Sequence, residues 1–174
     1  MMTDLSHLSQ RERREQLVRE HMADENLLAF ERVLATFPHP HYELVPTATV
    51  HDGIDAVKKY YAESRRAFPD QRNEILSLRH ADDAVIVEFM LRGTHLGPLG
   101  AIPPTGNAFE CRMTAFFIFT GSTLVCERVY FDSMTILRQL LGQVRLSSPA
   151  SLLRAVRVLI GLRRAQHPAS QPPQ

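Results

Sequence analysis

The sequence has no tryptophan, only two cysteines and no long apolar run. Cys111 and Cys126 form neither a CxxC pair nor a Cys/His spacing typical of zinc, which excludes a disulfide framework and a zinc ribbon. No segment approaches the ~20 apolar residues that span a bilayer. The first 20 residues carry RERRE where a signal peptide would have its apolar core. We therefore expect a cytoplasmic protein.

Acidic residues are absent after Asp132, whereas six arginines follow it, so residues 133–174 carry +6 and residues 1–132 carry −5. An acidic body without an RNA-binding aromatic motif argues against nucleic acid as a partner. The arginines give residues 150–164 the pattern of a basic amphipathic helix. For this helix we expect docking on its own domain or dimerisation rather than membrane contact. A disordered Pro-, Gln- and Ser-rich end is expected to follow it.

The composition of the full chain is typical of one globular domain, with 44% hydrophobic and 22% charged residues among 174. Apolar spacing predicts helices at residues 9–37 and 54–68, and an extended edge segment at 39–53. Alternating patterns predict strands near 73–79, 84–95, 107–120 and 123–132, before a short helix at 133–141. This order argues for an α+β domain over residues 1–142, followed by a basic segment over 143–174.

Gly121 and Ser122 form a two-residue hairpin turn that sets the register of the last two strands. In this register Cys111 faces Asp132 and Phe117 faces Cys126. One face is then apolar, with Arg128, Tyr130 and Asp132 at one end, and Glu127 lies on the opposite face. A strand bulge would reverse that placement of Glu127. Because both faces are apolar, we expect helices and a cavity on one side and a second subunit, in a homodimer, on the other.

Asp132 is the candidate catalytic group, because burial at an apolar strand end would raise the pKa of its carboxyl toward values useful for proton transfer. The alternative is a helix N-cap, since a helical pattern begins at Ser133. Glu88 is expected to be an outer charge, or a second catalytic carboxylate if its strand faces the other way. The histidines of the HPH stretch and His51 do not have the spacing of a metal site, and we expect no metal.

The segments RGTHLGPLGAIPPTG (92–106) and CERVYFDSMTILRQLLG (126–142) resemble the SnoaL-like polyketide cyclase family, with the likeness covering about residues 25–142. The resemblance implies the cone-shaped α+β barrel of the nuclear transport factor 2-like superfamily. It also implies an acid/base aspartate at the position of Asp132, and ring closure of a hydrophobic carbonyl compound by intramolecular aldol condensation without metal or organic cofactor. Arg128 and the extensions at both ends depart from the family pattern.

Six residues are expected to contact a hydrophobic ligand, by their place near the predicted cavity: His95, Tyr130, Arg128, Met113, Phe117 and Tyr61. Two other functions stay open, a non-catalytic carrier and an epoxide hydrolase. In relatives an epoxide hydrolase needs an Asp-Arg-Asp trio with a positioned water; Asp132 and Arg128 are present, but the second inward aspartate is not located. A lone capped Asp132 would favour the carrier. Two or more inward polar groups within reach of each other would favour an enzyme.

Overall fold

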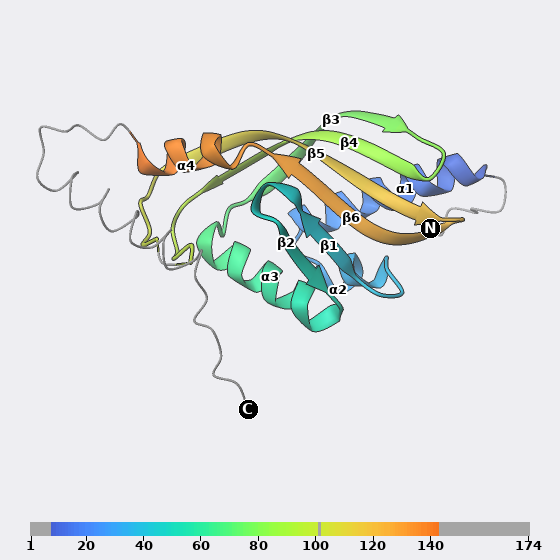
Figure 1. The fold of residues 1–174 in the computed structure, drawn as a ribbon, viewed down its shortest axis with the longest axis horizontal. Helices are drawn as coiled ribbons and strands as arrows, with labels where there is room; N and C mark the ends of the chain where they lie inside the picture. Colours follow the sequence, from blue (N-terminus) through green and yellow to red (C-terminus); the bar gives the residue numbers. More distant parts are fainter. Residues whose placement is uncertain (1–7, 101, 143–174) are drawn as a thin grey trace, which may run out of the picture.

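The computed structural model describes residues 8–100 and 102–142 (Figure 1). Its helices are α1 (Gln10–Asn26), α2 (Phe30–Ala35), the 3-10 turn η2 (Val45–Thr47), α3 (Ile54–Ala67) and α4 (Ser133–Leu141). Its strands are β1 (His41–Leu44), β2 (Thr49–Asp52), β3 (Arg72–His80), β4 (Ala84–Thr94), β5 (Ala108–Thr120) and β6 (Thr123–Phe131). The predicted α+β class is confirmed. The predicted basic helix and the 143–174 segment lie outside the described residues.

The first predicted helix is in fact two helices. Ser9 caps the start of α1 through a capping box with Glu12. The helix ends before Leu28, because the φ of this residue is 58°, a left-handed value that a right-handed helix does not contain. The chain then turns into α2, which carries buried Val33 and Leu34. Leu27 lies at this break and is 69% exposed.

The six strands form one mixed sheet in the order β2-β1-β6-β5-β4-β3. All neighbours are antiparallel except β1 and β6, which run parallel with Tyr42 beside Glu127. The segment 39–53, predicted to be an extended edge, therefore forms a hairpin of two strands. β2 is the edge strand of the sheet, whereas β1 lies between β2 and β6. The internal position of β1 buries the side chain of Tyr42, which is 1% exposed because both the sheet and the helices cover it.

The predicted turn at Gly121-Ser122 is confirmed, since Thr120 pairs with Thr123, but the register beyond it is wrong by one residue. Phe119 pairs with Leu124 and Ile118 with Cys126, so one extra residue bulges from β6. After this bulge the faces of β6 exchange: Glu127 pairs with Phe117 on the inner face. Arg128 and Tyr130 fall on the outer face.

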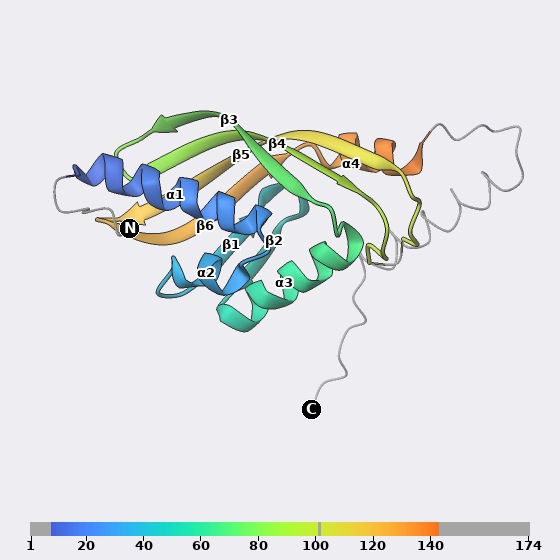
Figure 2. The same cartoon turned by 180° about the vertical axis from the view of Figure 1, so that it is seen from behind.

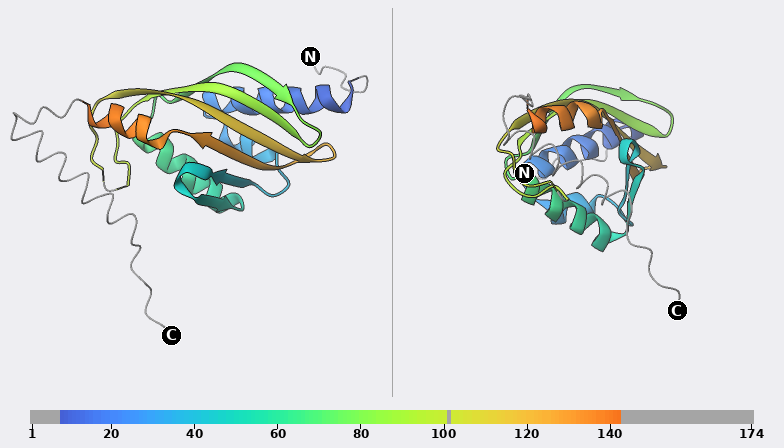
Figure 3. Two further views of the ribbon diagram at one scale, coloured as in Figure 1. Left: turned by 45° about the horizontal axis from the view of Figure 1, so that its top comes forward. Right: turned by 60° about the vertical axis from the view of Figure 1, so that its left-hand side comes forward.

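The sheet curves over α1, α2 and α3, which lie together on its concave side (Figures 1 and 2), and α4 packs near one end of β5. Seen toward that end, the sheet curls around α1 with α3 below it (Figure 3). The core between these layers is apolar and aromatic, and includes Val18, Val57, Phe117 and Leu124 with no exposed surface. Among the described helices none is both long and apolar enough to cross a membrane.

Candidate functional site

Asp132 lies at the start of α4 and is exposed. Its Oδ1 accepts hydrogen bonds from the backbone N–H groups of Met134 and Thr135, at 2.9 and 3.1 Å, and its Oδ2 accepts from the Thr135 hydroxyl. The Thr135 side chain and backbone hold the pKa of the Asp132 carboxyl below its usual range. The predicted rise of this pKa is therefore wrong, because the capping bonds are made to the charged carboxylate and outweigh the opposing effect of desolvation.

The predicted ligand contacts divide between the two faces of the sheet. Met113, Phe117 and Tyr61 are buried on the inner side. Tyr130 is 42% exposed and packs its ring on Phe116 of the outer face. Arg128 also points outward, where it binds Glu43. The bulge in β6 is the reason that these two residues do not face the barrel interior.

Glu88 was expected to be an outer charge, and the structure confirms it. Its carboxylate binds Arg112 at 2.6 Å and accepts a hydrogen bond from Ser77 at 3.1 Å. These contacts, the arginine first, lower the pKa of the Glu88 carboxyl. Its strand neighbours Val87 and Phe89 are buried on the opposite face of β4.

His95 follows β4 and is fully buried. Its Nδ1 lies 3.1 Å from the Thr105 hydroxyl and accepts a 3.3 Å hydrogen bond from the Thr105 backbone N–H, so the ring proton resides on Nε2. Within the described residues Nε2 has no hydrogen-bond partner. Burial lowers the pKa of His95, with the nearby Gly97 carbonyl opposing the fall. The ring is therefore a neutral donor beside Phe68.

A second group of polar side chains lies inside the barrel, where α1, α3, β1 and β6 meet. It consists of His21 and Glu25 of α1, Tyr42 of β1, Tyr61 of α3 and Glu127 of β6. His21, Tyr42, Tyr61 and Glu127 are all buried, and the Glu25 side chain keeps 14% of its surface exposed. We call these five residues the inner cluster.

Hydrogen bonds run through the inner cluster in one direction. Tyr61 donates to Glu25 Oε1 at 2.7 Å, so it accepts from Tyr42, whose hydroxyl lies 2.8 Å away. Tyr42 in turn accepts from His21 Nε2 at 3.1 Å. The chain thus leads from a fully buried imidazole to a mostly buried carboxylate that keeps 14% of its side-chain surface exposed.

The other His21 nitrogen is also a donor. Thr36 gives its hydroxyl proton to the Val33 carbonyl at 2.6 Å, so its oxygen accepts from His21 Nδ1 at 2.9 Å. With both nitrogens donating, the ring is an imidazolium. Glu127 Oε2 lies 3.3 Å from Nε2 as the counter-charge, but outside hydrogen-bond geometry, because Nε2 points at Tyr42.

The electrostatics of the inner cluster favour the protonated forms of both His21 and Glu25. Burial disfavours the charged form of His21, but Glu127 outweighs it and the pKa of the imidazole is raised. Burial first and the Glu127 charge second raise the pKa of Glu25 to about 7. A group that titrates near neutral pH, as Glu25 does, can both take and return a proton, which is the property that acid/base catalysis requires.

A surface depression of about 250 Å³ lies elsewhere, at the start of α1, lined by Gln10, Arg11, Arg14, His80, Ala81 and Asp82. Arg14 is occupied there by the carbonyls of Asp82 and Gly121. None of the inner-cluster side chains lines this depression.

The register expected from the turn places Glu127 on the opposite face, and the bulge that would reverse this placement is present. His21, Glu25 and Tyr42 are not among the residues predicted to be functional. One signal was available for the first two: His21 and Glu25 stand four residues apart, the spacing that places two side chains on one helix face. Tyr42 carries no such signal, because it reaches Glu127 only through the parallel pairing of β1 with β6.

The fold and this interior define an α+β barrel protein whose curved sheet encloses titratable groups. A scan of family models matches residues 15–140 to the SnoaL-like polyketide cyclase family. The chain belongs to that family, and the resemblance noted in its motifs is confirmed. A search of curated proteins finds no match.

Solved structures share the nuclear transport factor 2-like fold at low sequence identity. AclR of Streptomyces galilaeus, provisionally assigned as a hydroxylase, is 20% identical to this chain with a TM-score of 0.65. The alignment covers 92% of this chain and 100% of AclR. IdmH of Streptomyces antibioticus, provisionally assigned as a polyketide cyclase, is 21% identical with a TM-score of 0.63, covering 73% and 97%. A protein of Catenulispora acidiphila with a ketosteroid isomerase-like fold, solved in complex with trimethylamine, is 15% identical with a TM-score of 0.62; the alignment covers 71% of this chain and 91% of that protein.

Proposed function

We propose that the protein is an enzyme that moves protons on a hydrophobic carbonyl compound and closes a ring by an aldol-type reaction, with the inner cluster as acid and base. One observation carries the proposal: five polar side chains meet inside the barrel within hydrogen-bond or ion-pair distance, whereas Asp132 is an exposed helix cap. Inward polar groups within reach of each other favour an enzyme over a carrier.

Glu127 is the proposed base. Its Oε2 makes no hydrogen bond within the described residues, whereas both Glu25 oxygens accept one, from Tyr61 and Asn73. The Glu127 carboxylate takes a proton from the carbon next to a carbonyl, and the enolate attacks a second carbonyl of the same molecule. The new alkoxide receives a proton from His21, and Glu127 then returns the abstracted proton to the imidazole. Atoms and charges balance without an added reactant.

The phenols of Tyr42 and Tyr61 support these steps as hydrogen-bond partners. Burial first, and the nearby carboxylates second, raise the pKa of both hydroxyls well above the usual value, so both stay neutral donors. Through Tyr61 and Glu25 the interior also has a hydrogen-bonded route to the surface for proton exchange.

The substrate would lie along the inner face of β6, from Glu127 toward α4. Val129 and Phe131 follow Glu127 on that face. Six apolar residues around this end of the barrel are only partly buried: Leu44, Tyr60, Leu91, Leu99, Phe131 and Ile136. An apolar surface with polar groups at its inner end suits a large hydrophobic molecule with few oxygens. His95, a neutral buried donor, is a further candidate contact for one of those oxygens.

The test starts from native mass spectrometry of protein from its own host, to identify a bound compound. That compound and a panel of polycyclic aromatic ketones and esters are then incubated with the protein in D₂O, with NMR following deuterium exchange next to the carbonyl and ring closure. We expect Glu127→Gln to lower the rate at least ~100-fold, as loss of a general base does. Glu88→Gln, the same change on the outer face, should leave the rate unchanged.

The remaining variants separate the alternatives. Loss of turnover in Asp132→Asn with full turnover in Glu127→Gln would overturn the proposed base and return the role to Asp132. Tight binding of the compound with no turnover in the wild type would identify a carrier. The epoxide hydrolase alternative loses support because Arg128, one of its required groups, is bound to Glu43 on the outer face.

The homodimer also remains a proposal. Phe116, Ile118 and Tyr130 lie on the outer sheet face and are only partly covered within one chain. A second subunit on this face would bury them. Sedimentation equilibrium of the wild type and of Phe116→Glu tests this: we expect a dimer that the charge dissociates, and a monomeric wild type would refute it.

A further inference from the structure

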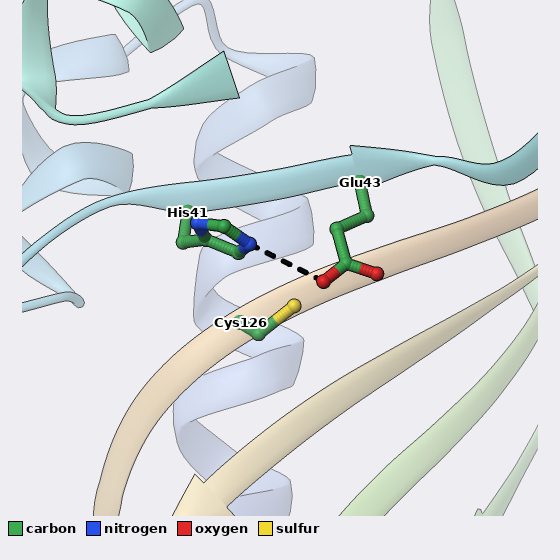
Figure 4. Close-up of side chains that lie close together, drawn as sticks. All are labelled: His41, Glu43 and Cys126. Atoms are coloured by element: carbon green, nitrogen blue, oxygen red, sulfur yellow. Dashed lines mark hydrogen bonds and ion pairs between the residues drawn. The ribbon is translucent and has the colours of Figure 1, made fainter. Parts of the chain in front are cut away.

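Three metal-ligating side chains point toward one another from the outer face of β1 and β6, away from the inner cluster (Figure 4). They are His41, Glu43 and Cys126, whose nitrogen, carboxylate oxygen and sulfur all lie within 4.8 Å of one another. His41 Nε2 and Glu43 Oε1 are 3.2 Å apart. The His41 and Glu43 side chains keep 29% and 26% of their surface exposed, so an ion can reach them.

The strand geometry explains why these three residues meet. His41 and Glu43 flank the inward Tyr42, so both project outward. The bulge in β6 pairs Cys126 with Ile118 of the outer row. The parallel pairing of β1 with β6 then brings the sulfur beside the two β1 side chains.

A carboxylate already orients the histidine. Asp52 Oδ1 lies 2.8 Å from His41 Nδ1 and 2.9 Å from His39 Nε2. A metal-bound histidine almost always donates its other ring N–H to such a partner, which fixes the ring and leaves the opposite nitrogen for the ion. Nε2, the nitrogen that faces Glu43 and Cys126, is the one left for a ligand role.

We propose that His41, Glu43 and Cys126 bind a divalent zinc-like cation on the outer face of the sheet. Nitrogen, oxygen and thiolate sulfur are the donors that zinc takes in proteins. Tetrahedral coordination at ordinary bond lengths separates N from O by about 3.3 Å and either from S by about 3.6 Å. The first separation is already present, and the sulfur needs to approach by at most about 1.2 Å. Binding displaces the proton on Nε2 and the thiol proton to solvent.

Arg128 competes for one of the three ligands. Its guanidinium binds Glu43 Oε2 through Nε, and its Nη2 lies 3.3 Å from Oε1. An ion on Oε1 displaces only the longer contact, and the arginine remains on the other oxygen. Arg128→Gln is therefore expected to tighten binding of the ion.

The test uses tag-free full-length protein stripped with a chelator, titrated with Co²⁺ and Zn²⁺. We expect one ion per chain and a thiolate-to-cobalt charge-transfer band in the ultraviolet. Cys126→Ser should abolish the band and weaken zinc at least ~100-fold, and Asp52→Asn should weaken it about 10-fold. Cys111→Ser removes the other buried cysteine and is the matched control, in which band and affinity should persist.

Thermal unfolding with and without zinc gives a second readout, since an ion that binds the folded state raises the Tm. If Cys126→Ser does not fold, His41→Asn on the partly exposed strand takes its place, and it should lose the zinc-induced rise. Failure of the wild type to bind one ion per chain would overturn the proposal. So would equal affinity in Cys126→Ser and Cys111→Ser, or full affinity in His41→Asn.

Discussion

Glu25 ties the stability of this protein to pH, and Glu25→Gln tests the electrostatics of the inner cluster. The pKa of its carboxyl is raised from 4.5 to about 7 in the folded chain by burial and by the Glu127 charge. A carboxyl whose folded pKa lies above its unfolded pKa favours folding at low pH, and this contribution is lost as pH rises through about 7.

The size of the effect follows from that shift. One pKa unit corresponds to about 1.4 kcal/mol, so the shift costs the folded state about 3 kcal/mol by pH 8 as an upper value. His21, whose pKa is also raised, acts in the same direction. In Glu25→Gln the amide stays neutral. It can accept from Asn73 and donate to Tyr61, whose own proton then goes to Tyr42.

Urea unfolding between pH 5 and 8 measures the effect, followed by circular dichroism because the chain has no tryptophan. We expect the free energy of unfolding of the wild type to fall by about 2–3 kcal/mol more than that of Glu25→Gln over this range. Glu20→Gln, an exposed glutamate of the same helix, should keep the wild-type slope. Equal slopes in the wild type and Glu25→Gln would refute the assignment of a raised pKa to Glu25.

Three further substitutions test the packing. Tyr42→Phe should lower the free energy of unfolding by about 2 kcal/mol in urea titrations, because it leaves buried partners unpaired, whereas exposed Tyr130→Phe should change it by less than about 0.5 kcal/mol. Asp132→Ala should cost about 1 kcal/mol in the same titrations by removing the α4 cap, and an unchanged midpoint would contradict the capping bonds. In Gly97→Ala the new Cβ would lie 1.9 Å from the Arg66 carbonyl oxygen, so we expect a Tm lowered by several degrees, and a wild-type Tm would show that the loop tolerates the shift.

Local patterns in the sequence were enough for the fold class and for most of the helices and strands. Alternating and helical spacings gave α3, α4 and the last four strands close to their observed bounds, because each element buries one face and its period reveals that face. The two long motifs identified the family, which the match over residues 15–140 confirms. Even the N-cap role of Asp132 was readable from its place before Ser133.

The tertiary structure decided which residues form the site. A single bulged residue in β6 places Glu127 inward and Arg128 outward. The local sequence pattern does not predict a bulge, because it assumes that side chains alternate between the two faces along the whole strand. The parallel pairing of β1 with β6 is equally nonlocal, yet it brings Tyr42 to Glu127 inside the barrel and His41 and Glu43 to Cys126 outside. Burial then sets the pKa of Glu25, since a carboxylate loses hydration only when elements distant in sequence close around it.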